Sequence, residues 1–194
     1  MLLILIIVIV AGSSSPKKTV KKYMNAVIAV DSATANEYCA FDYEQYIVDY
    51  YSEDNLEQLM EDENSWMSFY DDVDDIYDGL EDAFPDYDGK IESGKDVYDA
   101  FVAEQNSELE EAEYKEFEIV EVEKVDLDES DIEDYEELLF DDDSNLDSKD
   151  YFNTKKIKSV ARVKVKYKSE SGNDTASILL VKMGSKWKVL DGLY

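Results

Sequence analysis

Apolar residues recur every three or four positions along the first half of the chain, a spacing that predicts amphipathic helices. The first helix begins at Ser15 and Pro16, because a serine hydroxyl caps free backbone N–H groups and proline suits the first helical turn. Its apolar stripe consists of Val20, Met24, Val27 and Ile28. Asp31 or Ser32 then caps a second, shorter helix whose apolar positions are Ala35, Tyr38 and Cys39.

The longest helical pattern follows Ser52, which is a third expected cap. Apolar and aromatic positions continue through residues 56–80, and Asn64 and Ser65 mark the point where this pattern can break. The segment FPDYDGKIESG predicts a loop from its Pro, Asp and Gly content. A further helix is indicated by Val97, Tyr98, Phe101 and Val102.

The period changes to two in the second half of the chain, which predicts strands. In EYKEFEIVEVEKVDL, Phe117 and Ile119 lie on one face of a strand, whereas Val120 and Val122 lie on the other. This phase slip predicts a β-bulge in a bent strand. A capping box at Ser130–Glu133 then predicts a helix, and the acidic segment FDDDSNLDSKD predicts a loop.

Three strands are expected to end the chain. The first alternates apolar inner positions, Ile157, Ala161, Val163, Val165 and Tyr167, with basic outer positions, Lys156, Lys158, Arg162, Lys164, Lys166 and Lys168. The next strand, TASILLVKM, is apolar on both faces, as a central strand is. A two-residue hairpin turn at Gly184 and Ser185 leads to the last strand, which directs Trp187 and Val189 inward.

This order of elements predicts an α+β fold, in which N-terminal helices pack on a curved antiparallel sheet of about four strands. The segments SPKKTVKKYMNAVIAVDSATANEY and ILLVKMGSKWKVL carry a resemblance to the nuclear-transport-factor-2-like (cone-shaped, cystatin-like) fold. More narrowly, the chain resembles small exported lipoproteins of Gram-positive bacteria with that fold. The resemblance implies a fold and an export address but no activity, because the fold hosts enzymes, ligand carriers and adaptor domains.

The first 14 residues are expected to form a signal or anchor segment. An apolar run of about ten residues is too short to cross a bilayer as a helix, and small and polar residues follow it, as in a secretory signal. The alternative is a buried core strand. Ser13 stands where the lipoproteins carry a lipid-bearing cysteine. We therefore expect one α+β domain over residues 15–194, located outside the cell at the outer face of the cytoplasmic membrane.

Charge is distributed unevenly along a chain whose net charge is −29. Residues 1–30 carry +4, residues 31–154 carry −40, and residues 155–194 carry +7, and a helical stretch at about 45–110 is strongly acidic. The net field would repel a polyanion, so we expect no nucleic-acid partner. The absence of histidine excludes Ser–His and Cys–His catalysis, and the single cysteine, Cys39, excludes an internal disulfide.

Two segments are candidates for ligand binding. Asp141, Asp143, Asn145 and Asp147 alternate as calcium ligands do, but the glycine and glutamate that an EF-hand requires are Leu146 and Phe152 here, so the alternative is a solvated loop. On the inner sheet face, the candidate ligand-binding residues are Phe117, Tyr167 and Trp187, and the alternative is that helix side chains fill this face. We expect no cofactor.

The basic outer face of the 157–168 strand allows two interpretations, which can also be combined. It could dock onto wall teichoic acid or anionic lipid, or it could relieve the self-repulsion of the acidic helices. The combination of the two has the lysine-rich ends of the chain toward the membrane and the acidic body outward. We expect an exported cell-envelope binding or scaffolding protein without catalytic activity, held near the membrane by its N-terminal segment and partnered by a cell-wall polymer or an envelope protein. The alternative is a small-molecule-binding protein or a ketosteroid-isomerase-like enzyme that uses the apolar cone.

Overall fold

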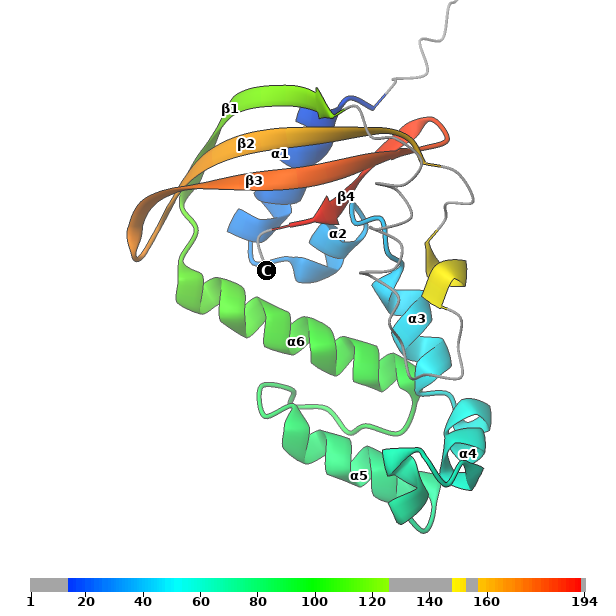
Figure 1. The fold of residues 1–194 in the computed structure, drawn as a ribbon. Helices are drawn as coiled ribbons and strands as arrows, with labels where there is room; N and C mark the ends of the chain where they lie inside the picture. Colours follow the sequence, from blue (N-terminus) through cyan, green and yellow to red (C-terminus); the bar gives the residue numbers. More distant parts are fainter. Residues whose placement is uncertain (1–13, 126–147, 153–156, 193–194) are drawn as a thin grey trace, which may run out of the picture.

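The computed structural model of the chain describes residues 14–125, 148–152 and 157–192. Within them the fold is α+β, with helices in the N-terminal half followed by a four-stranded antiparallel sheet of order β1-β2-β3-β4 (Figure 1). The helices are α1 (Pro16–Ile28), α2 (Ser32–Asn36), α3 (Tyr43–Tyr50), α4 (Glu53–Glu61), α5 (Val73–Ala83) and α6 (Gly94–Ala112), with 3-10 turns η1 (Trp66–Phe69) and η2 (Ser148–Tyr151). The strands are β1 (Glu116–Val125), β2 (Ile157–Ser169), β3 (Gly172–Met183) and β4 (Lys186–Asp191).

Helix α1 lies across one face of the sheet (Figure 1). It begins as predicted, with the Ser15 side chain accepting a hydrogen bond from the Lys18 backbone N–H. The buried residues between α1 and the sheet form the sheet cluster, which includes Val20, Tyr23, Met24, Val27, Ala161, Val163, Val165, Ile178, Leu180, Trp187 and Val189. The inward direction predicted for Val163, Val165 and Trp187 is therefore confirmed. The sheet is not strongly curled, so the pronounced curvature expected of a cone is not observed.

The predicted β-bulge is present in β1. The pairing of β1 with β2 shifts register between Ile119 and Glu121, so Val120 is the extra residue. As a consequence Phe117, Ile119 and Val122 all face the same side of the sheet, opposite Tyr167, Val165 and Val163 respectively. The bulge therefore accounts for the change of phase in the apolar alternation of this strand.

The inner position predicted for Ile157 is wrong. The pairing of β2 with β3 shifts register between Ile157 and Val160, which turns Ile157 to the opposite face from Ala161. There it packs against the outer cluster, a small core of Ala40, Val160, Leu179, Val181 and Met183 that also contacts Phe152. Strand β3 is thus apolar on both faces, as predicted, because the sheet cluster covers one and the outer cluster the other.

Residues 53–92, called the helical lobe below, form a second core. The expected break in the helical pattern is confirmed, because α4 ends at Glu61 and η1 and α5 follow as separate elements. Their apolar sides meet α6 in the helical cluster, which consists of Leu56, Leu59, Met67, Ile76, Tyr77, Ile91, Val97 and Ala100. Helix α6 joins the two cores, because Val97 belongs to the helical cluster and Leu109 to the sheet cluster.

Helix α3 was not predicted from the sequence, although it too joins the cores. Asp42 caps it, accepting a hydrogen bond from the Gln45 backbone N–H. Tyr43 packs on the sheet cluster, whereas Ile47, one turn further on, packs on the helical cluster. Because none of its residues is fully buried, α3 lacks the clean apolar stripe by which a helix is found in a sequence.

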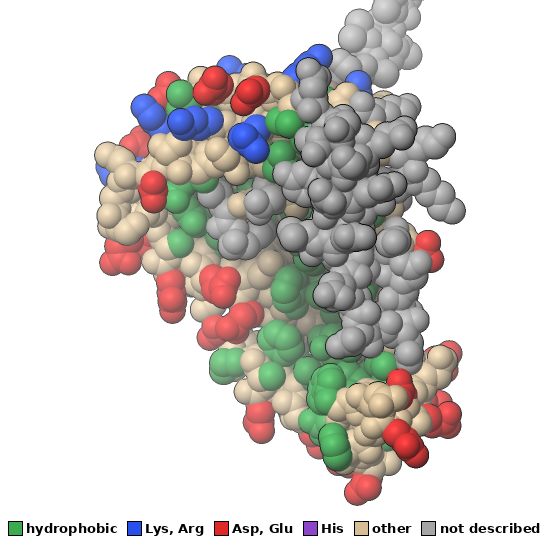
Figure 2. Space-filling view, in the orientation of Figure 1, with side chains coloured by type: hydrophobic (Ala, Val, Ile, Leu, Met, Phe, Trp, Pro, Cys, Tyr) green, Lys and Arg blue, Asp and Glu red, His purple; other side chains and the backbone are tan. Residues whose placement is uncertain are grey.

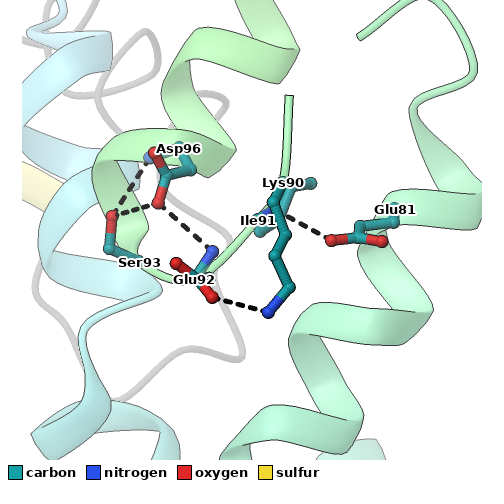
Figure 3. A network of polar contacts seen from close by, with 6 residues as sticks. All are labelled: Glu81, Lys90, Ile91, Glu92, Ser93 and Asp96. Atoms are coloured by element: carbon teal, nitrogen blue, oxygen red, sulfur yellow. Dashed lines mark hydrogen bonds and ion pairs between the residues drawn. The ribbon is translucent and has the colours of Figure 1, made fainter. Parts of the chain in front are cut away.

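The start of α6 is fixed by a polar network (Figure 3). Ser93 caps the helix, accepting from the Asp96 backbone N–H and donating its hydroxyl to Asp96 Oδ2 over 2.6 Å. The same carboxylate oxygen accepts from the Glu92 backbone N–H at 3.2 Å. The Ile91 backbone N–H donates to Glu81 of α5 at 3.0 Å, so the end of the connection that leads into α6 is bonded to both helices.

Some predicted features lie outside the described residues, namely residues 1–13 of the N-terminal segment, the helix after Ser130 and most of the acidic loop that follows it. Among the helices that are described, none combines the length and apolar character needed to cross a bilayer.

Candidate functional site

The outer face of the sheet carries two facing rows of opposite charge. The basic row on β2 consists of Arg162, Lys164, Lys166 and Lys168, and the acidic row on β1 consists of Glu123, Glu121, Glu118 and Glu116, paired in that order. The bulge makes this possible, because the glutamates change from even to odd positions where the strand changes phase. The positive face that stands out in the sequence therefore has its counter-charges on the neighbouring strand, and not on the acidic helices.

These rows balance each other over an exposed surface. Lys168 Nζ lies 3.8 Å from Glu116 Oε1, and such exposed pairs are individually worth about 0–1 kcal/mol. On the other side of β2 the basic row faces uncharged residues of β3, with Lys164 opposite Ser177, Lys166 opposite Thr175 and Lys168 opposite Asn173. The two rows thus present four positive and four negative side chains, so together they add little net charge that would attract a polyanion.

The lysines of α1 are a different case. Lys17, Lys18, Lys21 and Lys22 are exposed on the side of α1 that faces away from the sheet. Lys22 Nζ lies 5.6 Å from the centre of the Tyr38 ring. No carboxylate in the described part of the chain lies within ion-pair distance of Lys17, Lys18 or Lys21. Among the described residues, Arg162, Lys164 and Lys166 form no ion pair either, but each is paired in register with a glutamate of β1, whereas α1 itself contains no Asp or Glu.

The opposite charge dominates the helical lobe. Residues 53–92 contain sixteen Asp and Glu residues but one lysine, Lys90. Figure 2 shows Lys and Arg side chains gathered at the sheet end of the molecule, interspersed with carboxylates, and Asp and Glu side chains over the helices below. The molecule is consequently polarised, because α1 carries four lysines and no acid, whereas the helical lobe at the other end of the molecule (Figure 1) carries the strongest negative charge.

A cleft of about 420 Å³ opens between the 36–44 segment, α6 and β4. Its polar walls include Asn36, Lys95, Tyr98 and Lys188. Lys95 is paired with Asp99, whereas Lys188 Nζ donates to the Glu37 carbonyl oxygen. Burial lowers the pKa of Lys188, and the nearby Lys186 lowers it further. The buried Asn36 Oδ1 has no hydrogen-bond partner among the described residues. The cleft can therefore accommodate a small polar molecule.

Cys39 also lines this cleft, but its thiol is poorly suited to nucleophilic chemistry. Burial raises the pKa of the Cys39 thiol to about 12, and the opposing effect of Lys188 is smaller. Because the thiolate is the reactive form, Cys39 is protonated at neutral pH and unreactive.

We accordingly expect iodoacetamide to label Cys39 in the folded chain at pH 8 at least about a hundred times more slowly than in the urea-unfolded chain. Burial raises the pKa of this thiol from 9 to about 12, so the neutral thiol favours the folded state. This contribution to the free energy of unfolding is complete below pH 9 and is lost as the pH rises through about 12. Mass spectrometry of timed samples measures both rates. Equal rates in the two states would contradict the buried position of Cys39.

The sequence-predicted ligand-binding residues share the inner face of the sheet but do not line the cleft. Trp187 is buried in the sheet cluster, and Phe117 and Tyr167 are half-buried against it. The Tyr167 ring also contacts Tyr114, with ring centres 5.4 Å apart. A role in ligand binding stays a prediction for these three residues.

The predicted metal ligands, Asp141, Asp143, Asn145 and Asp147, lie outside the described residues. Elsewhere, within the ranges that the structure describes, no three Cys, Asp or Glu side chains gather as the ligands of a metal ion would.

Sequence reasoning missed the acidic row of β1 and the cleft. The glutamates were visible as a period-two pattern, but their partners depend on which strand β1 adjoins, and a long segment separates it from β2. The cleft needs α3 and α6 in place, and α3 was not predicted. No family model, curated protein or solved structure was found to match this chain.

Proposed function

We propose that this chain is an exported, non-enzymatic binding or scaffolding protein of the cell envelope, oriented by its charge. In this proposal the α1 end faces an anionic surface at the outer side of the cytoplasmic membrane, and the helical lobe points away from it. The observation that carries the proposal is the spatial separation of α1, with its four exposed lysines, from the acidic helical lobe of residues 53–92 (Figure 1).

The position of α1 in the chain supports this orientation. The helix starts at Pro16, immediately after the segment that we expect to be the signal or anchor, so its lysines would be the first charges beyond that segment. Each lysine close to an anionic membrane surface contributes roughly 1 kcal/mol of attraction. The helical lobe would be repelled by the same surface, so both ends of the molecule favour one orientation. An anionic cell-wall polymer or an envelope protein remains the proposed further partner.

The test compares two variants of equal net charge. One replaces Lys17, Lys18, Lys21 and Lys22 by glutamine, and the other replaces Arg162, Lys164, Lys166 and Lys168 by glutamine. The measured quantity is the ratio of partitioning onto phosphatidylglycerol-containing vesicles to partitioning onto phosphatidylcholine vesicles, because the apolar N-terminal segment contributes similarly to both. This ratio is expected to fall about a hundredfold or more in the α1 variant and less than about threefold in the β2 variant.

The two variants separate local from global electrostatics. Equal losses in both would mean that net charge alone determines binding, and would contradict the orientation. No loss in the α1 variant would remove the membrane-facing role of α1 altogether.

We also propose the finer assignment of the fold, to the nuclear-transport-factor-2-like class. It is supported by the chain order of helices before strands and by the packing of α1 on an antiparallel sheet. The weak curl of the sheet is less typical of that class.

A second candidate function is small-molecule binding, and the cleft favours it. Its volume of about 420 Å³ suits a small ligand, and Tyr98 and Asp99 both line it, which are the residue types that a ketosteroid-isomerase-like site employs. A thermal-shift screen of small carboxylic acids and ketones tests this candidate. Binding there should raise the melting temperature of the parent chain and not that of a variant in which Ala33, on the cleft wall, is replaced by tryptophan.

A further inference from the structure

The helical lobe exposes two large aromatic side chains close together. Trp66 and Phe69, at the two ends of η1, are 53% and 89% exposed. Burying an aromatic side chain is strongly favourable, and tryptophan and tyrosine are over-represented among the residues that dominate protein–protein binding. Two such side chains left in water on one short turn therefore indicate a surface that a partner covers.

The exposure does not come from a loose loop. Met67, between the two aromatic residues, is fully buried in the helical cluster. Ser65 caps the turn, its hydroxyl accepting from the Met67 backbone N–H at 3.2 Å, and the Ser68 hydroxyl donates to the Ser65 carbonyl oxygen at 2.7 Å. The buried Met67 side chain and the hydrogen bonds of Ser65 and Ser68 thus fix the turn, and this holds the Trp66 and Phe69 side chains on its outer side.

The Trp66 indole is also positioned from the side. Its ring meets Tyr70 edge to face, with ring centres 5.9 Å apart. The Tyr70 ring lies over Gly79 of α5, where an added Cβ would lie 3.4 Å from the Tyr70 hydroxyl oxygen. Preorganised aromatic side chains lose little conformational freedom when a partner binds them, which favours a binding role.

The charges around the aromatic patch identify the kind of partner. Exposed carboxylates lie on both sides of η1 in the sequence, Glu61 and Glu63 before it and Asp71 and Asp72 after it, in a lobe with sixteen acids and one lysine. A second copy of a chain with net charge −29 would be repelled, and so would an anionic membrane. A positively charged protein segment with apolar side chains complements both the charge and the aromatic surface.

We propose that Trp66 and Phe69, with the carboxylates around them, form a docking surface for a basic amphipathic segment of another protein. This surface belongs to the helical lobe and is separate from the α1 lysines, so it does not depend on the membrane orientation proposed above. A chain positioned at the envelope would then bind its protein partner through the lobe.

The experiment uses the full chain and a synthetic helical peptide of alternating leucine and lysine blocks, labelled for fluorescence anisotropy. The chain is expected to bind this peptide, with an affinity that falls at least about tenfold between low and moderate salt, because the carboxylates contribute. Phe69→Ala and Trp66→Ala are each expected to weaken binding about tenfold or more. Val120→Ala is the matched control, because Val120 is also an exposed apolar residue, 47% exposed, but lies on β1.

Two further readouts distinguish the patch from simple charge attraction. An oligolysine peptide of the same charge should bind more weakly and should not respond to Phe69→Ala. Trp66 emission should shift to shorter wavelength on binding the amphipathic peptide, since Trp187 is already buried and the indole of Trp66 leaves water.

Three results would overturn the proposal. One is that the Phe69→Ala and Trp66→Ala variants are both folded in thermal melts and bind the peptide within about twofold of the affinity of the parent chain. Another is oligolysine binding as tightly as the amphipathic peptide. The third is a loss of vesicle partitioning in Phe69→Ala without a loss of peptide binding, which would assign the patch to lipid.

Discussion

Replacing Val163 by lysine is expected to cost about 3–5 kcal/mol of folding free energy, a large part of what a domain of this size possesses. Val163 has no exposed surface and lies between α1 and the sheet, so the new ammonium would be buried without a partner. Replacing the next residue, Lys164, by valine is expected to change stability by about 0.5 kcal/mol or less, because its side chain is on the exposed outer face. Urea denaturation followed by circular dichroism measures both.

The two substitutions test which face of β2 is buried, because one places lysine at the inner position and the other places valine at the adjacent outer position. Similar effects at Val163 and Lys164, or a larger effect at Lys164, would contradict the packing of α1 on this face. A folded Val163→Lys chain with its full stability would do the same.

Gly94→Ala is expected to destabilise the chain by about 1–3 kcal/mol, although alanine is normally the better helix residue. Gly94 is the first residue of α6, and a Cβ there would collide with the backbone carbonyl oxygen of Val48 in α3. A backbone oxygen cannot move aside as a side chain can, so α3 and α6 would have to separate. Because these two helices join the sheet cluster to the helical cluster, the cost should appear in the global unfolding transition.

Gly89→Ala is the matched control for this prediction. An added Cβ at Gly89 would meet the outer end of the Tyr87 ring, which can rotate away, so the expected change is close to zero. If Gly94→Ala were as stable as the parent chain, or more stable, the close approach of α3 and α6 would be incorrect.

The features that could be predicted from the sequence are those that depend on local periodicity. The helix at Ser15, the cap at Ser52, the break before Trp66 and the bulge near Val120 are all visible as changes of spacing or as capping residues. Each of them follows from the period of a helix or a strand and needs no knowledge of distant contacts.

The features that could not be predicted depend on which elements become neighbours. Ile157 fits the inner pattern of β2 in sequence, but a register shift in the pairing with β3 turns it to the other face. Helix α3 carries aromatic and β-branched residues that are all half-buried between two cores, so no stripe reveals it. The bulge bends one strand, yet the sheet as a whole is not strongly curled, because curl depends on all four strands.

The same distinction applies to the candidate sites. The basic row of β2 was evident in the sequence, but its meaning changes once the glutamates of β1 are found opposite it. The lysines of α1, which the sequence already places on the outer side of the first helix, have in contrast no acidic residue on their own helix. Trp66 and Phe69 belong in the sequence to the apolar and aromatic pattern of residues 56–80, and only the structure separates these exposed residues from the buried Met67.

The most direct test of the account is thiol reactivity along β2, because both the packing of α1 and the balance of the outer face require strict alternation of this strand. Single cysteines are placed at each position from 161 to 168 in a Cys39→Ala chain, and their alkylation rates are measured in the folded state. Cysteines replacing Arg162, Lys164, Lys166 and Lys168 should react at rates close to those of the unfolded chain, and those replacing Ala161, Val163 and Val165 about tenfold or more slowly. Uniform alkylation rates, or fast alkylation of cysteines that replace Val163 and Val165, would contradict the packing of α1 on the inner face of β2.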